Sequence, residues 1–287
     1  MKIVLLSALL AMNAGGGLDL LARPGAPQPH ERMREQSVQS QALGRAMKYR
    51  VLLPEQYDGS LQRYPVLYLL HGLGGDYKDW TTRSNLAVYT RGLPLIIVMP
   101  DGENQWYTNS ADGTARFEDY LLADLQADVE SKFRTISSRY GRAIAGLSMG
   151  GYGALKIALR KPASFAIAAS FSGAFNVTRD GELERLIGSS EVARTLKIFG
   201  PVGSQTRKDN DVFLLASALR PAGAPYIYMD CGIADTTLIG ANRELVIAIH
   251  KTGAAYEYHE LAGAHSWEYW DRRIREFLPV LMKKLGN

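Results

Sequence analysis

The chain is poor in several features that mark whole classes of protein. It has one cysteine in 287 residues, Cys231, which excludes an intrachain disulfide and a cysteine-based metal cluster. Its 33 basic and 29 acidic residues are spread along the chain without a basic run, and the formal net charge is only +4. We therefore expect no nucleic-acid partner. Cys231 itself is expected to be a small buried residue at a strand end.

The N-terminus lacks an apolar run long enough to span a bilayer. The run over residues 3–12 is much shorter than the roughly 20 apolar residues that a spanning helix needs. Behind Lys2 it resembles the apolar region of a secretory signal. We expect residues 1–22 to be a signal peptide and the protein to be secreted or periplasmic, or cytoplasmic if this run is not a signal. Residues 23–35 contain prolines and glycine and are expected to be a linker.

The remaining residues, 36–287, are expected to form a single domain of strands and helices. Polar-apolar alternation over residues 37–53 predicts an antiparallel pair of entry strands. Further strands are predicted at residues 64–70, 93–99, 143–145, 165–171, 226–230 and 255–261, and helices at 117–133, 154–159, 238–251 and from 267 onward. This alternation predicts an α/β fold with a mostly parallel, doubly wound sheet covered on both faces.

Two details of this pattern carry further expectations. Residues 174–224 lose the strand-helix regularity, with helices predicted at 182–187 and 212–219, and are expected to be a small cap-like insertion. The acidic residues Glu118, Asp119 and Asp124, near the start of the helix at 117–133, are expected on its solvated face.

Residues 143–155 give the strongest indication of chemistry. A short apolar strand is followed by Gly-Leu-Ser-Met-Gly at residues 146–150, the G-x-S-x-G pattern, and then by residues that suit a helix. The turn needs Gly146 and Gly150 because a Cβ at either position would collide across it. It would present the hydroxyl of Ser148 above the sheet, beside the free N–H groups of a helix N-terminus. The sequence thus predicts a nucleophile elbow at Ser148.

A serine nucleophile needs a base, because its hydroxyl is unreactive at neutral pH. His265 follows the last predicted strand in a glycine-bounded loop, whereas His250 falls inside a helix and His259 inside a strand. We therefore assign the base to His265.

The base in turn needs an acid, which in this chain order lies between the serine and the histidine. Asp235 stands in the turn after a strand, from which it can reach across to His265. Asp230, the alternative, ends the strand itself, where a carboxylate would point into the sheet. Asp235 is the favoured acid.

Two loops are expected to complete the site. The glycine-rich loop that begins at His71 would supply one oxyanion donor, the backbone N–H of Leu73, and the second would be the N–H of Met149. Trp106 and Tyr107 follow the next strand, at the strand end where open α/β sheets bind ligands. These two aromatic residues either line the site or pack beneath their loop.

Four stretches together resemble the esterase D-like family: residues 71–75, 146–155, 231–235 and 265–270, in that order. The resemblance extends over residues 36–285. The family includes feruloyl and acetyl-type carbohydrate esterases, tributyrin esterases, S-formylglutathione hydrolases and mycolyltransferases. It implies an α/β-hydrolase fold and a serine carboxylic-ester hydrolase without metal or organic cofactor, in which Ser148, Asp235 and His265 match the family triad.

The resemblance also guides the choice of substrate. Residues 101–107 look like the short-acyl and feruloyl branch, which favours a substrate-lining role; the expected lining residues are His71, Trp106, Tyr107 and Trp267. The leading hypothesis is hydrolysis of short-chain acyl, acetyl or feruloyl esters, on small molecules or saccharides, through an acyl-serine intermediate. The alternatives are S-formylglutathione hydrolysis, which the export signal and Leu147 before the serine argue against, and acyl transfer. A non-catalytic binding module is the least favoured, because all three triad residue types are present.

Overall fold

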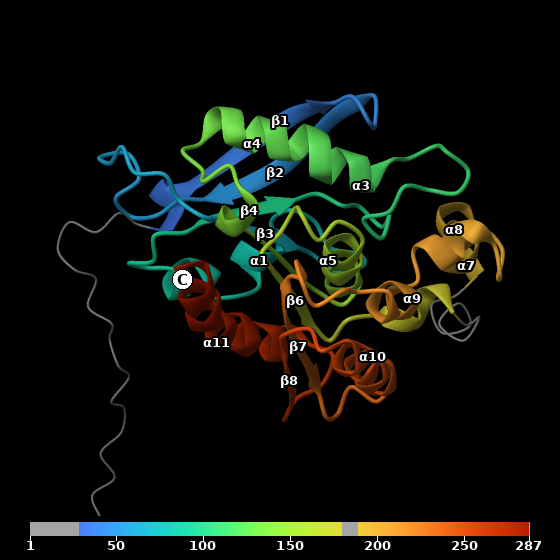
Figure 1. The fold of residues 1–287 in the computed structure, drawn as a ribbon. Coiled ribbons are helices and arrows are strands. Elements are labelled where there is room, and N and C mark those ends of the chain that lie inside the picture. Colours follow the sequence, from blue (N-terminus) through green and yellow to red (C-terminus); the bar gives the residue numbers. More distant parts are fainter. Residues whose placement is uncertain (1–28, 180–188, 287) are drawn as a thin grey trace, which may run out of the picture.

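The computed structural model describes residues 29–179 and 189–286 (Figure 1). The predicted signal peptide at 1–22, the first part of the predicted linker and the predicted helix at 182–187 lie outside the described residues. They stay predictions.

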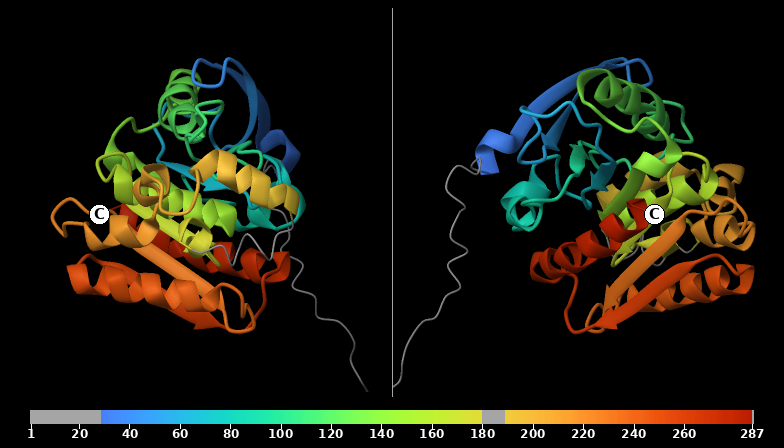
Figure 2. Two further views of the ribbon diagram at one scale, coloured as in Figure 1. Left: turned by 90° about the vertical axis from the view of Figure 1, so that its right-hand side faces the viewer. Right: turned by 60° about the vertical axis from the view of Figure 1, so that its left-hand side comes forward.

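An eight-stranded sheet organises the molecule, in the order β1-β2-β4-β3-β5-β6-β7-β8. The strands are β1 (Met33–Ser40), β2 (Arg45–Leu52), β3 (Val66–Leu70), β4 (Ile96–Pro100), β5 (Arg142–Leu147), β6 (Ile167–Phe171), β7 (Tyr226–Gly232) and β8 (Tyr256–Leu261). β1 pairs antiparallel with β2, and β2 with β4, while all later pairings are parallel. The β1–β2 hairpin and the β7–β8 pair form opposite edges of the twisted sheet (Figure 2). The predicted α/β-hydrolase fold is confirmed.

The central strands are apolar throughout because both faces of the sheet are covered. All five residues of β3 are buried. Val66, Tyr68 and Leu70 belong to one core cluster, whereas Leu67 and Leu69 belong to the other, as the alternation of side chains along a strand requires.

Helices cover each face. α1 (Asp79–Thr82), α2 (Leu86–Tyr89) and α11 (Trp267–Leu285) pack on one core cluster, and α4 (Gln126–Lys132), α5 (Met149–Arg160), α9 (Val212–Ser217) and α10 (Ile239–Thr252) pack on the other. α11 and the group of α5, α9 and α10 lie on opposite sides of the lower strands in Figure 1. None of the helices that the structure describes combines the length and the apolar character that crossing a membrane demands.

The ordered fold begins earlier than the predicted linker boundary at residue 35. A short 3-10 helix (Pro29–Arg32) leads directly into β1. Arg32 is buried, and its guanidinium donates hydrogen bonds to the Leu53 carbonyl at 2.9 Å and the Thr90 hydroxyl at 2.9 Å. The linker assignment was therefore wrong for residues 29–35, because a buried cation and strand pairing hold this segment to the domain.

The predicted helix at 117–133 is present as α3 (Phe117–Asp119), a π-helical stretch (Tyr120–Leu125) and α4, but one of its charges was misplaced. Glu118 is buried rather than solvated. Helical spacing puts it on the same side as the core residues Leu121 and Leu125, and there its carboxylate meets the Nζ of Lys156 on α5 at 2.6 Å.

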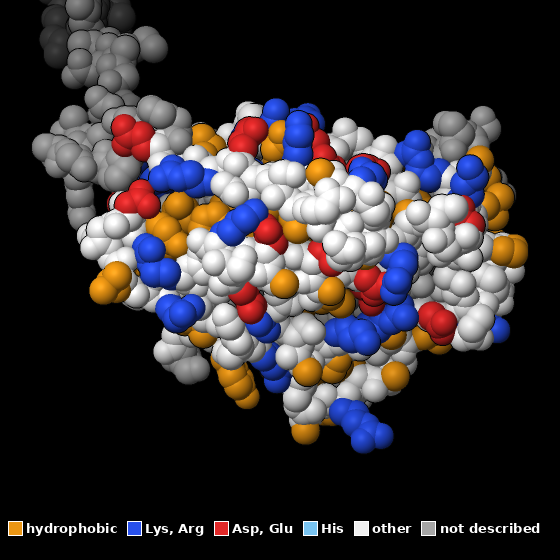
Figure 3. Space-filling view, turned by 90° about the horizontal axis from the view of Figure 1, so that it is seen from above, with side chains coloured by type: hydrophobic (Ala, Val, Ile, Leu, Met, Phe, Trp, Pro, Cys, Tyr) orange, Lys and Arg blue, Asp and Glu red, His pale blue; other side chains and the backbone are white. Residues whose placement is uncertain are grey.

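Asp119 and Asp124 also have partners. Asp119 pairs with Arg116 within the same turn. Asp124 accepts hydrogen bonds from the Ser40 hydroxyl and the Ala42 N–H of the entry hairpin. On the face that Figure 3 shows, acidic and basic side chains are interspersed.

The segment between β6 and β7 contains a 3-10 helix (Phe175–Thr178), α7 (Ser189–Phe199), α8 (Gln205–Asp209) and α9. In Figure 1, α7 and α8 lie beyond α5 and α9, away from the sheet. Phe199 of α7 packs edge-on against Trp106, with 6.1 Å between ring centroids. The described part of this insertion thus packs against the loop that follows β4.

Candidate active site

Ser148 stands at a tight turn between β5 and α5. Its backbone has φ 51° and ψ −115°, a region that non-glycine residues rarely occupy. A Cβ on Gly146 would lie 2.4 Å from the carbonyl carbon of Gly150, and a Cβ on Gly150 would lie 2.6 Å from the His71 carbonyl oxygen. The two glycines are thus required by close backbone approach, and the turn has the geometry expected of a nucleophile elbow.

The turn is held in place by backbone hydrogen bonds to β6 and to the segment that follows it. The Ser148 N–H donates to the Phe171 carbonyl at 3.0 Å, and the Ser148 carbonyl accepts from the Ala174 N–H at 3.2 Å. β5 lies between β3 and β6 in the parallel part of the sheet, so the serine emerges at the carboxyl edge of the central strands. This is the edge at which open α/β sheets bind ligands.

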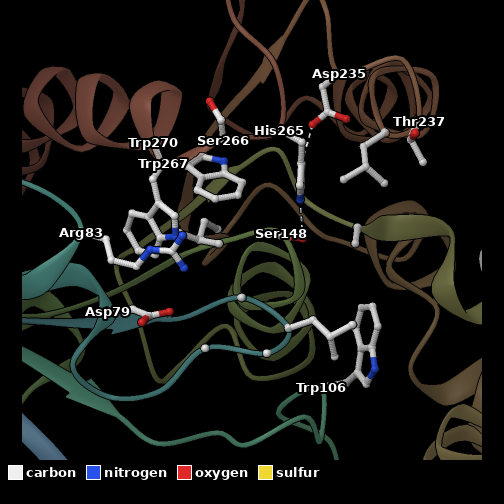
Figure 4. Close-up of a pocket in the computed structure, with 17 residues that line it drawn as sticks. Asp79, Arg83, Trp106, Ser148, Asp235, Thr237, His265, Ser266, Trp267 and Trp270 are labelled. Atoms are coloured by element: carbon white, nitrogen blue, oxygen red, sulfur yellow. Dashed lines mark hydrogen bonds and ion pairs between the residues drawn. The ribbon is translucent and has the colours of Figure 1, made fainter. Parts of the chain in front are cut away.

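Three side chains from distant parts of the chain meet at this edge (Figure 4). The Nε2 of His265 lies 3.0 Å from the Ser148 hydroxyl oxygen, and its Nδ1 lies 2.7 Å from a carboxylate oxygen of Asp235. Asp235 is buried, whereas the His265 side chain is 38% exposed at the cavity mouth. A proton on Nδ1, donated to Asp235, leaves the Nε2 lone pair free for the proton of Ser148.

The loops that carry the acid and the base are joined to each other. The Ala234 N–H, next to Asp235, donates to the Gly263 carbonyl at 2.9 Å. The His265 ring stands perpendicular to the ring of Trp270, with 4.8 Å between centroids. These contacts fix the orientation of the imidazole before any substrate is present.

Asp230, the alternative acid, has a different environment. It is fully buried in β7, where it accepts a hydrogen bond from the Tyr269 hydroxyl at 3.0 Å. Burial raises the pKa of its carboxyl well above the usual range, against the lowering effect of the Tyr269 hydrogen bond. His259, on β8, instead contacts Glu257, and His250, on α10, contacts the Tyr256 hydroxyl. The structure therefore brings Asp235 and His265, rather than these alternatives, to Ser148.

Two backbone N–H groups have the placement of oxyanion donors. Met149 is the first residue of α5, where an N–H has no partner within the helix. Leu73 lies on the cavity wall, and a Cβ on its neighbour Gly72 would be 3.6 Å from the Ser148 Cβ. Within residues 29–179 and 189–286, neither N–H donates to another group of the protein. Both remain available to a ligand oxygen.

A cavity of about 650 Å³ opens above Ser148. Its wall is formed by Gly72, Leu73, Gly74, Gly75, Asp79, Arg83, Trp106, Leu147, Ser148, Ala174, Asp235, Thr237, Leu238, His265, Ser266, Trp267 and Trp270. Figure 4 shows Trp267 and Arg83 on one side of the serine and Trp106 on the other. The structure thus places two of the predicted lining residues, Trp106 and Trp267, on the wall.

The other two predicted lining residues, His71 and Tyr107, lie behind the wall. Both are 1% exposed. The Tyr107 hydroxyl donates to the His71 carbonyl at 3.1 Å, and a Cβ on Gly102 would lie 2.1 Å from the Tyr107 ring. The lining assignment is therefore corrected for these two residues. Because Gly102 has no Cβ, the Tyr107 ring can pack beneath the loop instead of lining the cavity.

Sequence reasoning missed a charged part of the wall formed by α1 and the residue after it. The Arg83 guanidinium lies over the Trp267 ring, 5.1 Å from its centroid. Burial raises the pKa of the neighbouring Asp79 carboxyl, although the positive charge of Arg83 opposes this shift. The position of these residues just after the glycine-rich loop was the available signal.

No group of three or more histidine, cysteine, aspartate or glutamate residues is arranged to hold a metal ion in the described parts of the chain.

The sequence profile of the family described as Putative esterase matches residues 40–281. The chain belongs to this esterase family. The resemblance inferred from the four sequence stretches is thereby confirmed.

The chain is also similar to curated proteins whose names state an activity. The chain is 35% identical over 251 residues to an esterase of Mycobacterium tuberculosis strain H37Rv, a match that covers 79% of this chain and 54% of the relative. The chain thus spans about half the length of that protein. It is 28% identical to an acetyl esterase of Caldicellulosiruptor saccharolyticus, over 76% of this chain and 84% of the relative.

A solved structure extends the family comparison to three dimensions. Fluorophosphonate-binding serine hydrolase F of Staphylococcus aureus, determined with substrate bound, superposes with a TM-score of 0.76 at 26% identity. The match covers 87% of this chain and 98% of that chain. The sheet and its connections are therefore shared over nearly the whole length of that hydrolase.

Proposed function

We propose that the chain hydrolyses carboxylic esters with short acyl groups through an acyl-serine intermediate. The continuous hydrogen-bonded series from Asp235 through His265 to Ser148, which ends in an open cavity, is the observation that carries the proposal. Family membership supports the reaction class. The acetyl esterase among the relatives supports a small acyl group, and a feruloyl group is the larger alternative within the same reaction.

In the first half of the reaction, His265 removes the proton from the Ser148 hydroxyl as the oxygen attacks the ester carbonyl carbon. Asp235 stabilises the imidazolium that forms and keeps the proton on Nδ1. The negative charge that develops on the carbonyl oxygen is stabilised by the N–H groups of Leu73 and Met149. His265 then gives its proton to the leaving alcohol, and Ser148 carries the acyl group.

In the second half, water takes the place of the alcohol. His265 removes a proton from the water, which attacks the acyl carbon, and the same two N–H groups stabilise the second tetrahedral intermediate. The bond to the Ser148 oxygen breaks, and the proton returns from His265 to that oxygen. The free carboxylic acid leaves and the starting enzyme is restored.

The two ends of the cavity differ in polarity. Trp106 lies on one side of Ser148, where its apolar surface suits a short acyl chain, whereas Asp79 and Arg83 bring charge to the other side (Figure 4). A ring of feruloyl size would have to pack against Trp106.

The proposal is tested by hydrolysis of p-nitrophenyl acetate. We expect turnover by the wild type and loss of nearly all of it in Ser148→Ala and His265→Ala, because removal of either residue ends acyl-enzyme formation. His250→Ala, a histidine on α10 that contacts Tyr256 instead, serves as the matched control and keeps full activity. Activity in Ser148→Ala equal to that of the wild type would refute the mechanism.

A panel of esters then narrows the substrate. p-Nitrophenyl acetate, butyrate and octanoate, with methyl ferulate and S-formylglutathione, vary the acyl group and the leaving group separately. The proposal expects kcat/KM to fall from butyrate to octanoate and to be low for S-formylglutathione. Preferential hydrolysis of the thioester would instead indicate the S-formylglutathione reaction, and ester formation with an added alcohol in place of hydrolysis would indicate acyl transfer.

We also propose that the protein is exported to the periplasm or the medium. Lys2 and the apolar run over residues 3–12 support this. Expression of the whole chain followed by N-terminal sequencing of the exported fraction tests it: cleavage near residue 22 is expected, and an uncleaved protein confined to the cytoplasm contradicts it.

A further inference from the structure

Residues 101–107, which follow β4, contact the glycine-rich loop at residues 71–75 at three points, and we call residues 71–75 the oxyanion loop. The Gly102 N–H donates to Nε2 of His71 at 2.9 Å, and the Tyr107 hydroxyl donates to the His71 carbonyl at 3.1 Å. The third contact is the N–H of Gly74, which donates to the side-chain oxygen of Asn104 at 2.7 Å. We call residues 101–107 the clamp loop.

The first two contacts fix the buried start of the oxyanion loop. Because Nε2 of His71 accepts a backbone N–H, the ring proton lies on Nδ1, which is 2.8 Å from the Gly72 carbonyl. His71 therefore acts as a bridge between the clamp loop and the peptide that precedes Leu73.

The Asn104 contact fixes the other end, beyond Leu73. Gly74 is exposed and has φ 77°, and a Cβ placed there would meet nothing within 4 Å. The glycine is therefore needed for its backbone angle rather than for space. With the Gly74 N–H held by Asn104, the peptide planes on both sides of the Leu73 Cα are fixed. The direction of the Leu73 N–H follows from them.

The clamp loop can fix the position of the oxyanion loop because its own backbone is strongly constrained. Glu103, Trp106 and Tyr107 all have positive φ, 46°, 54° and 51°, which persists in non-glycine residues only where the surroundings enforce it. Part of that enforcement comes from the buried Lys156 of α5, whose Nζ donates to the Tyr107 carbonyl at 2.7 Å. The N-terminal residue of the same helix, Met149, bears the second proposed oxyanion donor. Both donors are thus positioned relative to α5.

We propose that Asn104 is a positioning residue for catalysis, which directs the Leu73 N–H at the developing oxyanion by holding the next peptide. The inference rests on the proposed function, because it matters only if a tetrahedral intermediate forms at Ser148. Asn104 is not among the residues that form the cavity wall, and its side-chain oxygen accepts the Gly74 N–H, so it acts through the loop rather than on the substrate.

The test compares Asn104→Ala, Asn104→Asp and a control variant outside the clamp loop, all in the whole protein. In Asn104→Ala we expect kcat for p-nitrophenyl acetate to fall about tenfold with KM almost unchanged, a smaller loss than the roughly 100- to 1000-fold that follows complete removal of a donor. Binding of phenylboronic acid, which forms a tetrahedral adduct with the serine, should weaken by the same factor. A purely structural role would lower the melting temperature without this parallel change.

Asn104→Asp keeps an oxygen that accepts the Gly74 N–H, so it should restore most of kcat and of boronate affinity in about 0.5 M salt, which screens the added charge. The control is Gln205→Ala, which removes an exposed amide on α8 that donates to Asp209 at 2.7 Å. It should leave both quantities unchanged.

The outcomes separate the two proposals. Unchanged kcat and boronate affinity in Asn104→Ala, or an Asn104→Asp variant as impaired as Asn104→Ala, would overturn the positioning role while the esterase activity of the wild type stands. A wild type without Ser148-dependent hydrolysis would overturn the proposed function itself, and the positioning role with it.

Discussion

The buried pair between Lys156 and Glu118 allows a quantitative prediction about stability. Both side chains are almost completely buried, and 2.6 Å separates Nζ from the carboxylate oxygen. Burial raises the pKa of Glu118, but the charge and hydrogen bond of Lys156 and the charge of Arg160 outweigh it, so the pKa lies below its usual value. We therefore treat Glu118 as ionised in the folded protein at neutral pH.

Replacement of Glu118 by Gln leaves Lys156 without its counter-charge in the core. The folded protein can respond by releasing the lysine proton, which at pH 7 costs about 1.36 kcal/mol for each of the roughly 3.4 pH units below its ordinary pKa, or about 4.6 kcal/mol. Loss of one partner of a buried ion pair typically costs about 3 to 5 kcal/mol. The two figures agree on about 4 kcal/mol, which for a domain of this size lowers the melting temperature by roughly 8 °C.

The pH dependence of this loss identifies its cause. Burial lowers the pKa of Lys156 even in the wild type, where the charge of Glu118 opposes the shift. Loss of that charge in Glu118→Gln should lower this pKa further, so over a wider pH range the unfolded chain of the variant binds more protons than the folded one. The stability of the variant relative to the wild type must then rise with pH, and at pH 9.5 the difference should have shrunk to about 1 kcal/mol. Urea denaturation at pH 7 and at pH 9.5 measures both values.

Two further variants make the argument refutable. Glu118→Leu combined with Lys156→Met removes both charges and should recover at least half of the lost stability. Glu268→Gln removes an exposed carboxylate that lies 3.7 Å from Arg272 and should change the free energy of unfolding by less than about 1 kcal/mol. A loss in Glu118→Gln that is independent of pH, or as small as in Glu268→Gln, would show that Lys156 does not depend on Glu118 for its burial.

Three other substitutions test separate parts of the structure. Burial raises the pKa of Asp230, so the folded protein loses stability as the pH rises above about 4 toward that raised pKa. The melting temperature of Asp230→Asn should therefore increase relative to that of the wild type from pH 5 to pH 8. A lower melting temperature than the wild type at pH 8 would mean that the carboxylate is ionised and paired. Gly150→Ala places a Cβ 2.6 Å from the His71 carbonyl oxygen, so it should destabilise the folded protein by about 1 to 3 kcal/mol and abolish esterase activity. A melting temperature like that of the wild type would contradict the close backbone approach at this turn. Arg32→Met leaves the Leu53 carbonyl without a buried donor and should cost about 2 to 4 kcal/mol in urea denaturation, whereas an unchanged midpoint would mean that residues before β1 do not belong to the folded domain.

The sheet and the catalytic geometry were predictable because their signals are local. Continuous apolar runs identify strands covered on both faces, and the glycines at 146 and 150 identify a turn in which only one residue can be exposed. The position of Asp235 followed from the same reasoning, since a carboxylate in the turn after β7 can reach His265 whereas Asp230 within the strand cannot. Each inference needed only a few neighbouring residues.

The errors arose where a residue's environment is set by a distant partner. Glu118 was assigned to solvent because acidic residues favour the first turn of a helix, but Lys156, 38 residues later, supplies its counter-charge in the core. Tyr107 was expected on the wall, yet two consecutive residues with positive φ send it beneath the loop instead. Neither a buried counter-ion nor a left-handed loop residue can be read from helical or strand periodicity.

These environments show that the site is assembled from two separately supported halves. Lys156 ties the clamp loop, and through it the oxyanion loop, to α5, which also carries the nucleophile at its start. The base and the acid belong to the other half, where the Ala234 to Gly263 hydrogen bond joins their loops. At the catalytic centre the halves meet in the 3.0 Å contact between His265 and Ser148, and beneath it the register of β6 on β7 sets their separation. A substitution in the core between β6 and β7 should therefore impair catalysis out of proportion to its effect on stability, because a small shift there changes the distance across which the proton is transferred.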